Sequence, residues 1–188
     1  MSYFMMECYA AGIEDAARID SWPSVPGIRT WKTGARFKVP VPQPLRFAVD
    51  ANYGSTLLPL YNSTILLVQR TLFDQLLAAG VDNLDPYEAL IADPRTKQPS
   101  RSHVAVNVVG TIAAADMAKS KIDASVPDRL ISTDFESVVI DAGKARGALF
   151  FRLAENISAI VVHEQVCRRI NTAQFPGLKF IPPEQWMG

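Results

Sequence analysis

Hydrophobic positions form the same arrangement twice along the chain, once over residues 65–77 and once over residues 159–170. Each copy is a short aliphatic run followed at once by apolar residues three or four positions apart. A continuous aliphatic run is typical of a buried strand, and the wider spacing is typical of a helix. The pattern therefore predicts two similar strand–helix units in a packed domain. When the copies are superposed, the apolar positions that coincide are Val68 with Val162, Leu72 with Val166 and Leu76 with Ile170.

The first unit is predicted as a strand near Ile65–Val68 followed by a helix over Gln69–Ala79, with Gly80 as its C-terminal cap. An alternative starts the helix at Ser63, whose hydroxyl would cap the first turn. We prefer the strand because the second copy, at Ile160–Val162, is β-branched. The apolar stripe of the helix would be formed by Leu72, Phe73, Leu76 and Leu77.

Strict alternation of apolar and polar residues predicts strands elsewhere. Tyr3–Cys8 is predicted as a strand because it is rich in aromatic residues and methionine. Leu45–Val49 alternates, and His103–Val109 places three valines on one face. Between the first two, prolines punctuate residues 22–44 and favour loops and sheet edges, because proline donates no backbone hydrogen bond. Within that passage we predict an edge strand, from the alternation of Phe37, Val39 and Val41 with Arg36, Lys38 and Pro40.

Residues 82–93 fit two interpretations. Asp85-Pro86-Tyr87-Glu88 resembles a helix start, with an acidic cap and proline in the first turn. Tyr87–Ile91 also suits a strand, which would pair with His103–Val109 across the polar turn at residues 93–101. We favour this hairpin.

The remaining segments are short. Residues 111–119 are expected to form a connection or helical turn, and Ala142–Gly147 a hairpin turn. Further strands are predicted at Leu130–Thr133, Ser137–Asp141 and Ala148–Leu153, and a turn with a last extended piece at Phe175–Phe180. The fold class is therefore α+β, with mostly antiparallel short strands. By length it is a single domain over residues 1–188, with a proline-rich N-terminal segment (1–44) and a core (45–181).

Composition narrows the class of protein. The 19 basic and 19 acidic residues cancel, so no net charge attracts nucleic acid or an anionic membrane. Two cysteines make a disulfide framework improbable. The N-terminus lacks a basic leader, and no apolar run approaches the about 20 residues of a membrane span. We expect a cytoplasmic protein that binds neither nucleic acid nor membrane.

Candidate reaction chemistry is sparse. His163 and Cys167 lie four positions apart and could share a helix face. A zinc site needs three or four converging ligands, normally with a tight paired spacing. The other histidine and cysteine, His103 and Cys8, do not supply that spacing. No sequence context marks Cys167 as an activated nucleophile. The simpler interpretation is a histidine at a helix start and a buried thiol. Residues 142–147 lack the spacing of a phosphate-binding loop. No metal or cofactor is expected.

Charged residues form two stretches of opposite sign. Residues 29–46 carry Arg and Lys with interleaved aromatic residues, which suits a nucleic-acid surface less well than a charge-protected edge strand. The acidic stretch is explained by caps and turns, or else by a basic partner surface. Its members are Asp82, Asp85, Glu88 and Asp93.

Two polar residues interrupt apolar strands and are expected to be buried: Asn107 and Arg152. A buried arginine must be paired and hydrogen-bonded, and Asp116 or Asp134 are the natural partners. We predict a structural polar network of Asn107, Asp116 and Arg152.

These same segments resemble the bacterial immunity-protein family of polymorphic-toxin loci that was first defined around a myxobacterial protein. The resemblance runs from about Trp31 to Phe180 and rests on the order and spacing of several short motifs. They are Pro44–Phe47, Ala79–Leu84, Val104–Val108 with Asp116 and Ser120 downstream, Leu149–Leu153, Ile160–Val162 and Pro176–Phe180.

The resemblance implies a non-enzymatic protein that binds and neutralises a cognate toxin, encoded by a neighbouring gene or received from neighbouring cells. We hypothesise stoichiometric occlusion of the toxin, and a homo-oligomer remains open. The interface residues that we predict are Trp22, Trp31, Asp85, Tyr87, Glu88 and Asp93. The alternatives are a small enzyme acting on a nucleotide or peptide through His163 and Cys167, and a scaffold module.

Overall fold

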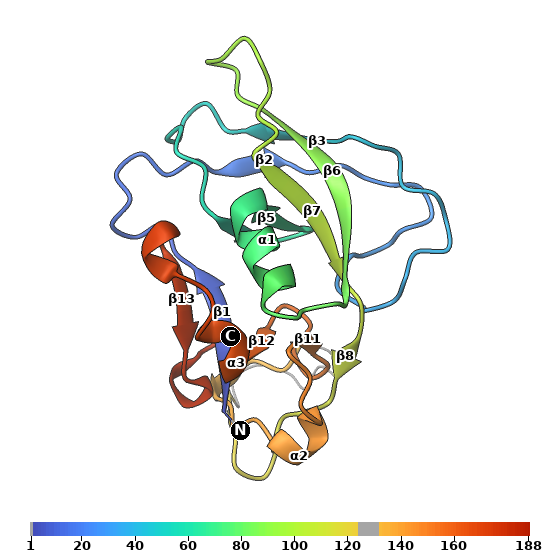
Figure 1. Ribbon diagram of the computed structural model, residues 1–188, viewed down its shortest axis with the longest axis vertical. Helices are drawn as coiled ribbons and strands as arrows, with labels where there is room; N and C mark the ends of the chain where they lie inside the picture. The colour runs from blue at the N-terminus through green and yellow to red at the C-terminus, as the bar shows by residue number, and fades with distance from the viewer. Residues whose placement is uncertain (1, 124–131) are drawn as a thin grey trace.

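The computed structural model describes residues 2–123 and 132–188. Two β-sheets lie one above the other in Figure 1, and helix α1 lies between them. The small helices and the C-terminal turns surround the lower sheet. Since helices are few and strands many, the protein is α+β, as the sequence predicted. In this described part of the chain, no helix combines the length and hydrophobicity that crossing a membrane requires.

The six-stranded sheet has the order β2-β3-β6-β7-β5-β4. Neighbouring strands are antiparallel except β3 beside β6. The bounds are β2 Ile19–Ser21, β3 Leu45–Val49, β4 Leu60–Asn62, β5 Leu66–Gln69, β6 Leu84–Ala92 and β7 His103–Val108.

The five-stranded sheet has the order β13-β1-β12-β11-β8 and is antiparallel except for β8 beside β11. A separate ribbon pairs β9 with β10. The strand bounds are β1 Tyr3–Cys8, β8 Thr111–Ile112, β9 Lys121–Ile122, β10 Phe135–Ser137, β11 Phe150–Leu153, β12 Ile160–His163 and β13 Leu178–Ile181. The helices are α1 Arg70–Ala78, α2 Ala142–Ala145 and α3 Glu164–Cys167, with 3-10 turns at Thr172–Gln174 and Pro183–Gln185.

The main core fills the space between the two sheets. Both predicted strand–helix units contribute to it, through β5 with α1 and β12 with α3. Their helices have nine and four residues, so the similarity of the two units stays a prediction. The six positions that coincide in sequence all belong to this one core: Val68, Leu72, Leu76, Val162, Val166 and Ile170.

Each sheet also buries its outer face. The covering loop, residues 22–43, packs over the outer face of the six-stranded sheet, where Trp31 is 3% exposed. Residues of β10, α2 and the C-terminal turn cover the outer face of the five-stranded sheet. Alternate residues of a strand point to opposite faces, so Met5 and Met6 of β1 belong to different cores and both are fully buried. The division into an N-terminal segment (1–44) and a core (45–181) stays a prediction. Strand β1, which belongs to the N-terminal segment, lies inside the five-stranded sheet.

Several predicted elements are confirmed. Tyr3–Cys8 and Leu45–Val49 are strands, and β6 pairs with β7 as the favoured hairpin. Helix α1 ends as predicted, because Gly80 has φ 98° and its amide donates to Leu77 O while Val81 N donates to Leu76 O. This reciprocal pair is a Schellman motif, which a glycine in the left-handed region permits.

Four predicted elements were wrong. Residues 111–112 form strand β8, which pairs with β11, instead of beginning a connection or helical turn. Residues 37–41 form no strand; the prolines supply no ladder donors, and the segment lies across the sheet as part of the covering loop. Ser137–Asp141 is not a strand beyond Ser137, since the strand there is β10. Residues 142–147 begin with helix α2 instead of a hairpin turn, because Asp141 accepts hydrogen bonds from Gly143 N and Lys144 N as its cap. The predicted strand at Leu130–Thr133 lies partly outside the described residues.

Candidate partner-binding surface

The predicted interface residues of strand β6 are divided between its two faces. Asp85 and Tyr87 point to the side of the covering loop, where Tyr87 packs edge-on against Trp31 with ring centroids 5.3 Å apart. Glu88 points the other way, toward the start of α1, where it pairs with Arg70 at 2.6 Å. Side chains of a strand alternate between faces, so these residues do not form one continuous patch.

The acidic and basic stretches meet in the fold. Arg36 of the covering loop pairs with Asp85 at 2.7 Å, and Arg95 pairs with Asp93 at 2.8 Å. Hydrogen bonds from Arg95 hold the pKa of Asp93 below its ordinary value. Because each of these acids already has an arginine partner at the surface, the acidic stretch presents much less net charge than its sequence indicated. Exposed pairs of this kind stabilise the fold only weakly.

A cleft of about 560 Å³ opens beside β2 and β4, and Trp22 lines it. Its rim holds Tyr53, which is 47% exposed, and Arg18. Arg18 Nη1 donates to Tyr53 Oη at 2.8 Å, and the guanidinium carbon lies 5.1 Å from the centroid of the Tyr53 ring. Aromatic and arginine side chains of this kind dominate protein–protein interfaces. We call this the Trp22 cleft; its main lining residues are Cys8, Ala17, Arg18, Ile19, Asp20, Trp22, Tyr53, Leu60, Tyr61 and Asn62.

The polar groups in the Trp22 cleft are held by local hydrogen bonds. Trp22 Nε1 donates to Ile19 O at 3.2 Å. Tyr61 Oη donates to Ala17 O at 3.0 Å and accepts from Leu58 N at 3.0 Å, and burial raises the pKa of Tyr61 to about 12. Burial also raises the pKa of the Cys8 thiol to about 11. Neither group is ionised near neutral pH, so the cleft suits binding better than proton transfer.

The rim of the Trp22 cleft continues to a second predicted interface residue. Arg95, the partner of Asp93, donates to Tyr53 O at 2.6 Å and to Gly54 O at 2.8 Å. Tyr53, which lines the Trp22 cleft, is therefore also joined to the Asp93–Arg95 pair. Neither Tyr53 nor Arg18 could be predicted from the sequence, since neither belongs to a motif or a charged run.

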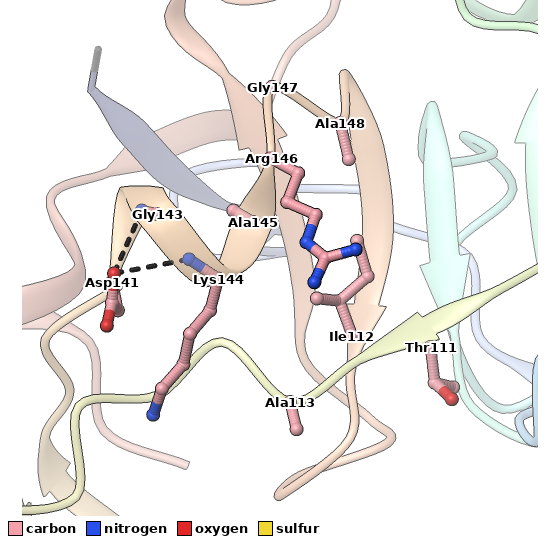
Figure 2. A pocket seen from close by; sticks show the side chains of 10 residues that line it. All are labelled: Thr111, Ile112, Ala113, Asp141, Gly143, Lys144, Ala145, Arg146, Gly147 and Ala148. Carbon is pink, nitrogen blue, oxygen red and sulfur yellow. Dashed lines mark hydrogen bonds between the residues drawn. The ribbon is translucent and has the colours of Figure 1, made fainter.

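A shallower basin of about 800 Å³ lies where α2 faces β8 (Figure 2). Lys144 and Arg146 extend toward the chain at residues 111–113, and Asp141 caps the start of α2. Lys144 Nζ donates to Ala115 O at 3.0 Å. Arg146 has φ 50°, a backbone conformation that residues other than glycine seldom adopt. The basin is lined by two cationic side chains, but the hydrogen bonds that Asp141 and Lys144 form there are made to groups of the protein itself.

Comparison with protein families supplies the identification. The model of the immunity protein family Imm11 matches residues 22–185, which is most of the chain. The chain belongs to the Imm11 immunity protein family. This confirms the resemblance found in the sequence and extends it to Trp22 at one end. A search among curated proteins found no match.

In this Imm11 protein, His163 and Cys167, the two residues of the enzyme alternative, have surroundings that suit structural roles. His163 begins α3, where its Nδ1 accepts from Gln165 N at 3.1 Å, and its ring packs edge-on against Tyr3. Burial raises the pKa of the Cys167 thiol to about 12, which is the reverse of nucleophile activation. Within residues 2–123 and 132–188, no group of three or more His, Cys, Asp or Glu side chains is arranged to hold a metal ion.

The predicted polar network is divided. Asn107 is buried and its Nδ2 donates to Ala35 O at 2.9 Å, so it anchors the covering loop. Asp116 pairs with Lys119 at 2.8 Å, and that contact lowers the pKa of Asp116. Arg152 is fully buried as predicted, but neither Asp116 nor Asp134 forms a salt bridge with it. Its hydrogen-bond partners are Asn62 Oδ1 of β4 and Ile157 O, which are neutral acceptors.

Proposed function

We propose that this protein neutralises a cognate toxin of a bacterial competition system by binding it stoichiometrically in the cytoplasm. Membership of the Imm11 family is the observation that carries this proposal, since it assigns the chain to the immunity proteins. The toxin would be the product of a neighbouring gene. The protein would act by occlusion and would have no catalytic role of its own.

We infer that the Trp22 cleft contributes to the toxin interface. It combines a concave surface with Trp22, Tyr53 and Arg18, residue types that supply most hot spots in protein complexes. Tyr53 is well exposed and is oriented by its hydrogen bond with Arg18, so little side-chain entropy would be lost on binding. An interface of ordinary size buries about 1,200–2,000 Å², so it would extend beyond the cleft.

The face of β6 remains a second candidate for the interface. Tyr87 is half-buried beside the exposed Arg36–Asp85 pair, and Glu88 lies on the opposite face with Arg70. Trp31 supports Tyr87 from beneath, and its burial leaves it no surface of its own for a partner.

Co-expression with the product of the neighbouring gene tests the function. We expect that product to arrest growth alone, and this protein to restore growth and to copurify with it in a fixed ratio. A neighbouring product that is harmless, or a toxin that this protein neither binds nor neutralises, would contradict the proposal. An enzyme would lose its effect in His163→Ala or Cys167→Ala with folding intact, whereas an immunity protein should keep it.

Variants of exposed side chains then locate the interface. Tyr53→Ala and Arg18→Ala should each weaken toxin binding by roughly tenfold or more, as loss of a hot-spot contact does. Met117→Ala is the matched control, because Met117 is 42% exposed and lies outside both surfaces. If Tyr87→Ala weakens binding while Tyr53→Ala does not, the face of β6 is the interface. Affinity is measured by calorimetric titration of purified proteins.

A further inference from the structure

Arg152 lies in β11 with two of its three guanidinium nitrogens unpartnered. The residue is fully buried, at 0% exposure. Its Nη1 donates to Asn62 Oδ1 at 3.2 Å and to Ile157 O at 2.9 Å, whereas Nε and Nη2 have no hydrogen-bond partner. A guanidinium carries its charge at neutral pH, and a buried donor without a partner is costly. Arg152 is therefore short of an acceptor.

A second cation is linked to the first through a chain of hydrogen bonds. Lys32 Nζ donates to Ser158 Oγ at 3.0 Å, and Asn62 Nδ2 donates to Ser158 O at 2.6 Å. Asn62 in turn accepts from Arg152, so the order is Lys32, Ser158, Asn62, Arg152. Burial lowers the pKa of Lys32 and the charge of Arg152 lowers it further, which agrees with two cations close together.

No acid in the described part of the chain neutralises these two cations. Neither Arg152 nor Lys32 takes part in any of the salt bridges formed among residues 2–123 and 132–188. Glu155 follows Arg152 closely in sequence, but its Oε1 accepts from Ala115 N at 3.3 Å, and its buried Oε2 has no hydrogen-bond partner, so it forms no salt bridge with Arg152. Among the described residues, therefore, no salt bridge compensates the charge of Arg152 or Lys32.

The two unpartnered nitrogens of Arg152 suit a particular kind of ligand. Nε and Nη2 lie on the same edge of a guanidinium, and two parallel N–H donors on one edge match the two oxygens of a carboxylate or phosphate group. We propose that Arg152 and Lys32 form a binding site for one oxyanion group, held side-on by Arg152 Nε and Nη2 and neutralised by both cations. Asn62 and Ser158 orient the two cations and are the positioning residues.

The chain of hydrogen bonds reaches solvent at its Lys32–Ser158 end, whereas Arg152 at the other end is fully buried. Ser158 is exposed, and Lys32 and Asn62 are half-buried, so small side-chain movements would admit a group of carboxylate size. Two sources supply this chemistry: a free small anion, or the tip of an Asp or Glu side chain of the bound toxin. Only the second source rests on the proposed function.

The first experiment uses the protein without any toxin. Its melting temperature is measured in phosphate and in acetate against chloride at equal ionic strength. At about ten times the dissociation constant, a bound anion should raise it by about 3–6 °C. Arg152→Met and Lys32→Met should abolish the rise. Lys144→Met, which removes an exposed lysine outside the site, should keep it. Lys32→Met also keeps the test valid if Arg152→Met fails to fold.

The second experiment measures toxin affinity of the wild type and of Lys32→Met. A loss of tenfold or more in the variant, with no effect of phosphate or acetate, identifies an acidic side chain of the toxin as the source. A rise with small anions and an unchanged toxin affinity identifies a free anion. If neither effect occurs, the site is overturned, and buried water is the better account of the unpartnered nitrogens. Wild-type toxin binding in that case leaves the proposed function standing.

Discussion

At the scale of single residues, the buried histidine of β7 has a defined role in stability. His103 is 2% exposed, and its Nε2 lies 2.9 Å from Leu58 O, which can only accept a hydrogen bond. Nε2 therefore carries the proton, and Nδ1 can accept from Ser102 Oγ at 2.8 Å. Burial lowers the pKa of His103 below its ordinary 6.5, because the charged ring would be desolvated.

This lowered pKa predicts a stability that falls in mild acid. Between the folded pKa of His103 and about 6.5, the unfolded chain binds a proton and the folded protein does not. The free energy of unfolding should therefore decrease as pH falls below about 6.5, by up to about 1.4 kcal/mol per pH unit. Denaturant unfolding at a series of pH values measures it.

Variants of the two histidines isolate this contribution. His103→Gln keeps an amide donor for Leu58 O and removes the titrating ring, so its slope between pH 5 and about 6.5 should be shallower. His163→Gln, which leaves the His103 ring in place, is the comparison variant. An identical slope in His103→Gln would show that other groups cause the pH dependence.

At the scale of elements, the covering loop is attached to the six-stranded sheet at specific backbone contacts. Gly110 N donates to Gly34 O at 2.7 Å, and Asn107 holds the loop at Ala35. A Cβ atom at Gly34 would lie 2.7 Å from Gly110 C and 2.8 Å from Thr111 N, which are backbone atoms. The loop can approach β8 this closely only with glycine at position 34.

Gly34→Ala should accordingly destabilise the protein more than the same change at another glycine of similar conformation. Gly34 has φ 73° and Gly12 has φ 84°, but nothing lies within 4 Å of a Cβ at Gly12. Gly12→Ala should cost about 1–2 kcal/mol from backbone conformation alone, and Gly34→Ala about 1–3 kcal/mol more from the overlap. Urea unfolding compares the two. Equal losses would mean that the loop moves aside freely.

At the scale of the whole molecule, the core between the sheets joins them into one cooperative unit. Leu72 of α1 is fully buried in this core together with Phe150 of β11 and Val162 of β12, which belong to the other sheet. Neither sheet can separate from α1 without exposing apolar surface of both. We expect a single unfolding transition.

Leu72→Ala should lower the free energy of unfolding by about 2–5 kcal/mol, because it leaves a cavity shared by both sheets. Leu77→Ala in the same helix is the matched control. Leu77, which the sequence placed in the apolar stripe, is 43% exposed, so its change should stay near or below about 0.5 kcal/mol. Tryptophan fluorescence reports the outer cores, where Trp31 and Trp186 lie, and circular dichroism reports the strands. Two separate transitions in Leu72→Ala would contradict a single cooperative unit.

The sequence by itself determined the features that depend on near neighbours. Alternation over Leu45–Val49 and His103–Val108 indicated strands, and the polar turn before His103 indicated the hairpin. Helical spacing with Gly80 at its end located α1, because periodicity and the left-handed cap are local properties. The succession of short motifs also indicated the immunity-protein family, which the family match confirms.

Only the tertiary structure decided which distant segments meet. It joined Arg36 to Asp85, one residue from each of two charged stretches that are separate in sequence. It placed Tyr53 and Arg18 at the rim of the Trp22 cleft, and it brought Asn62 instead of an acid to Arg152. Residues 62 and 152 lie 90 positions apart, and no local period encodes their contact. Such contacts follow from how two sheets stack on a shared core, which is a property of the whole chain.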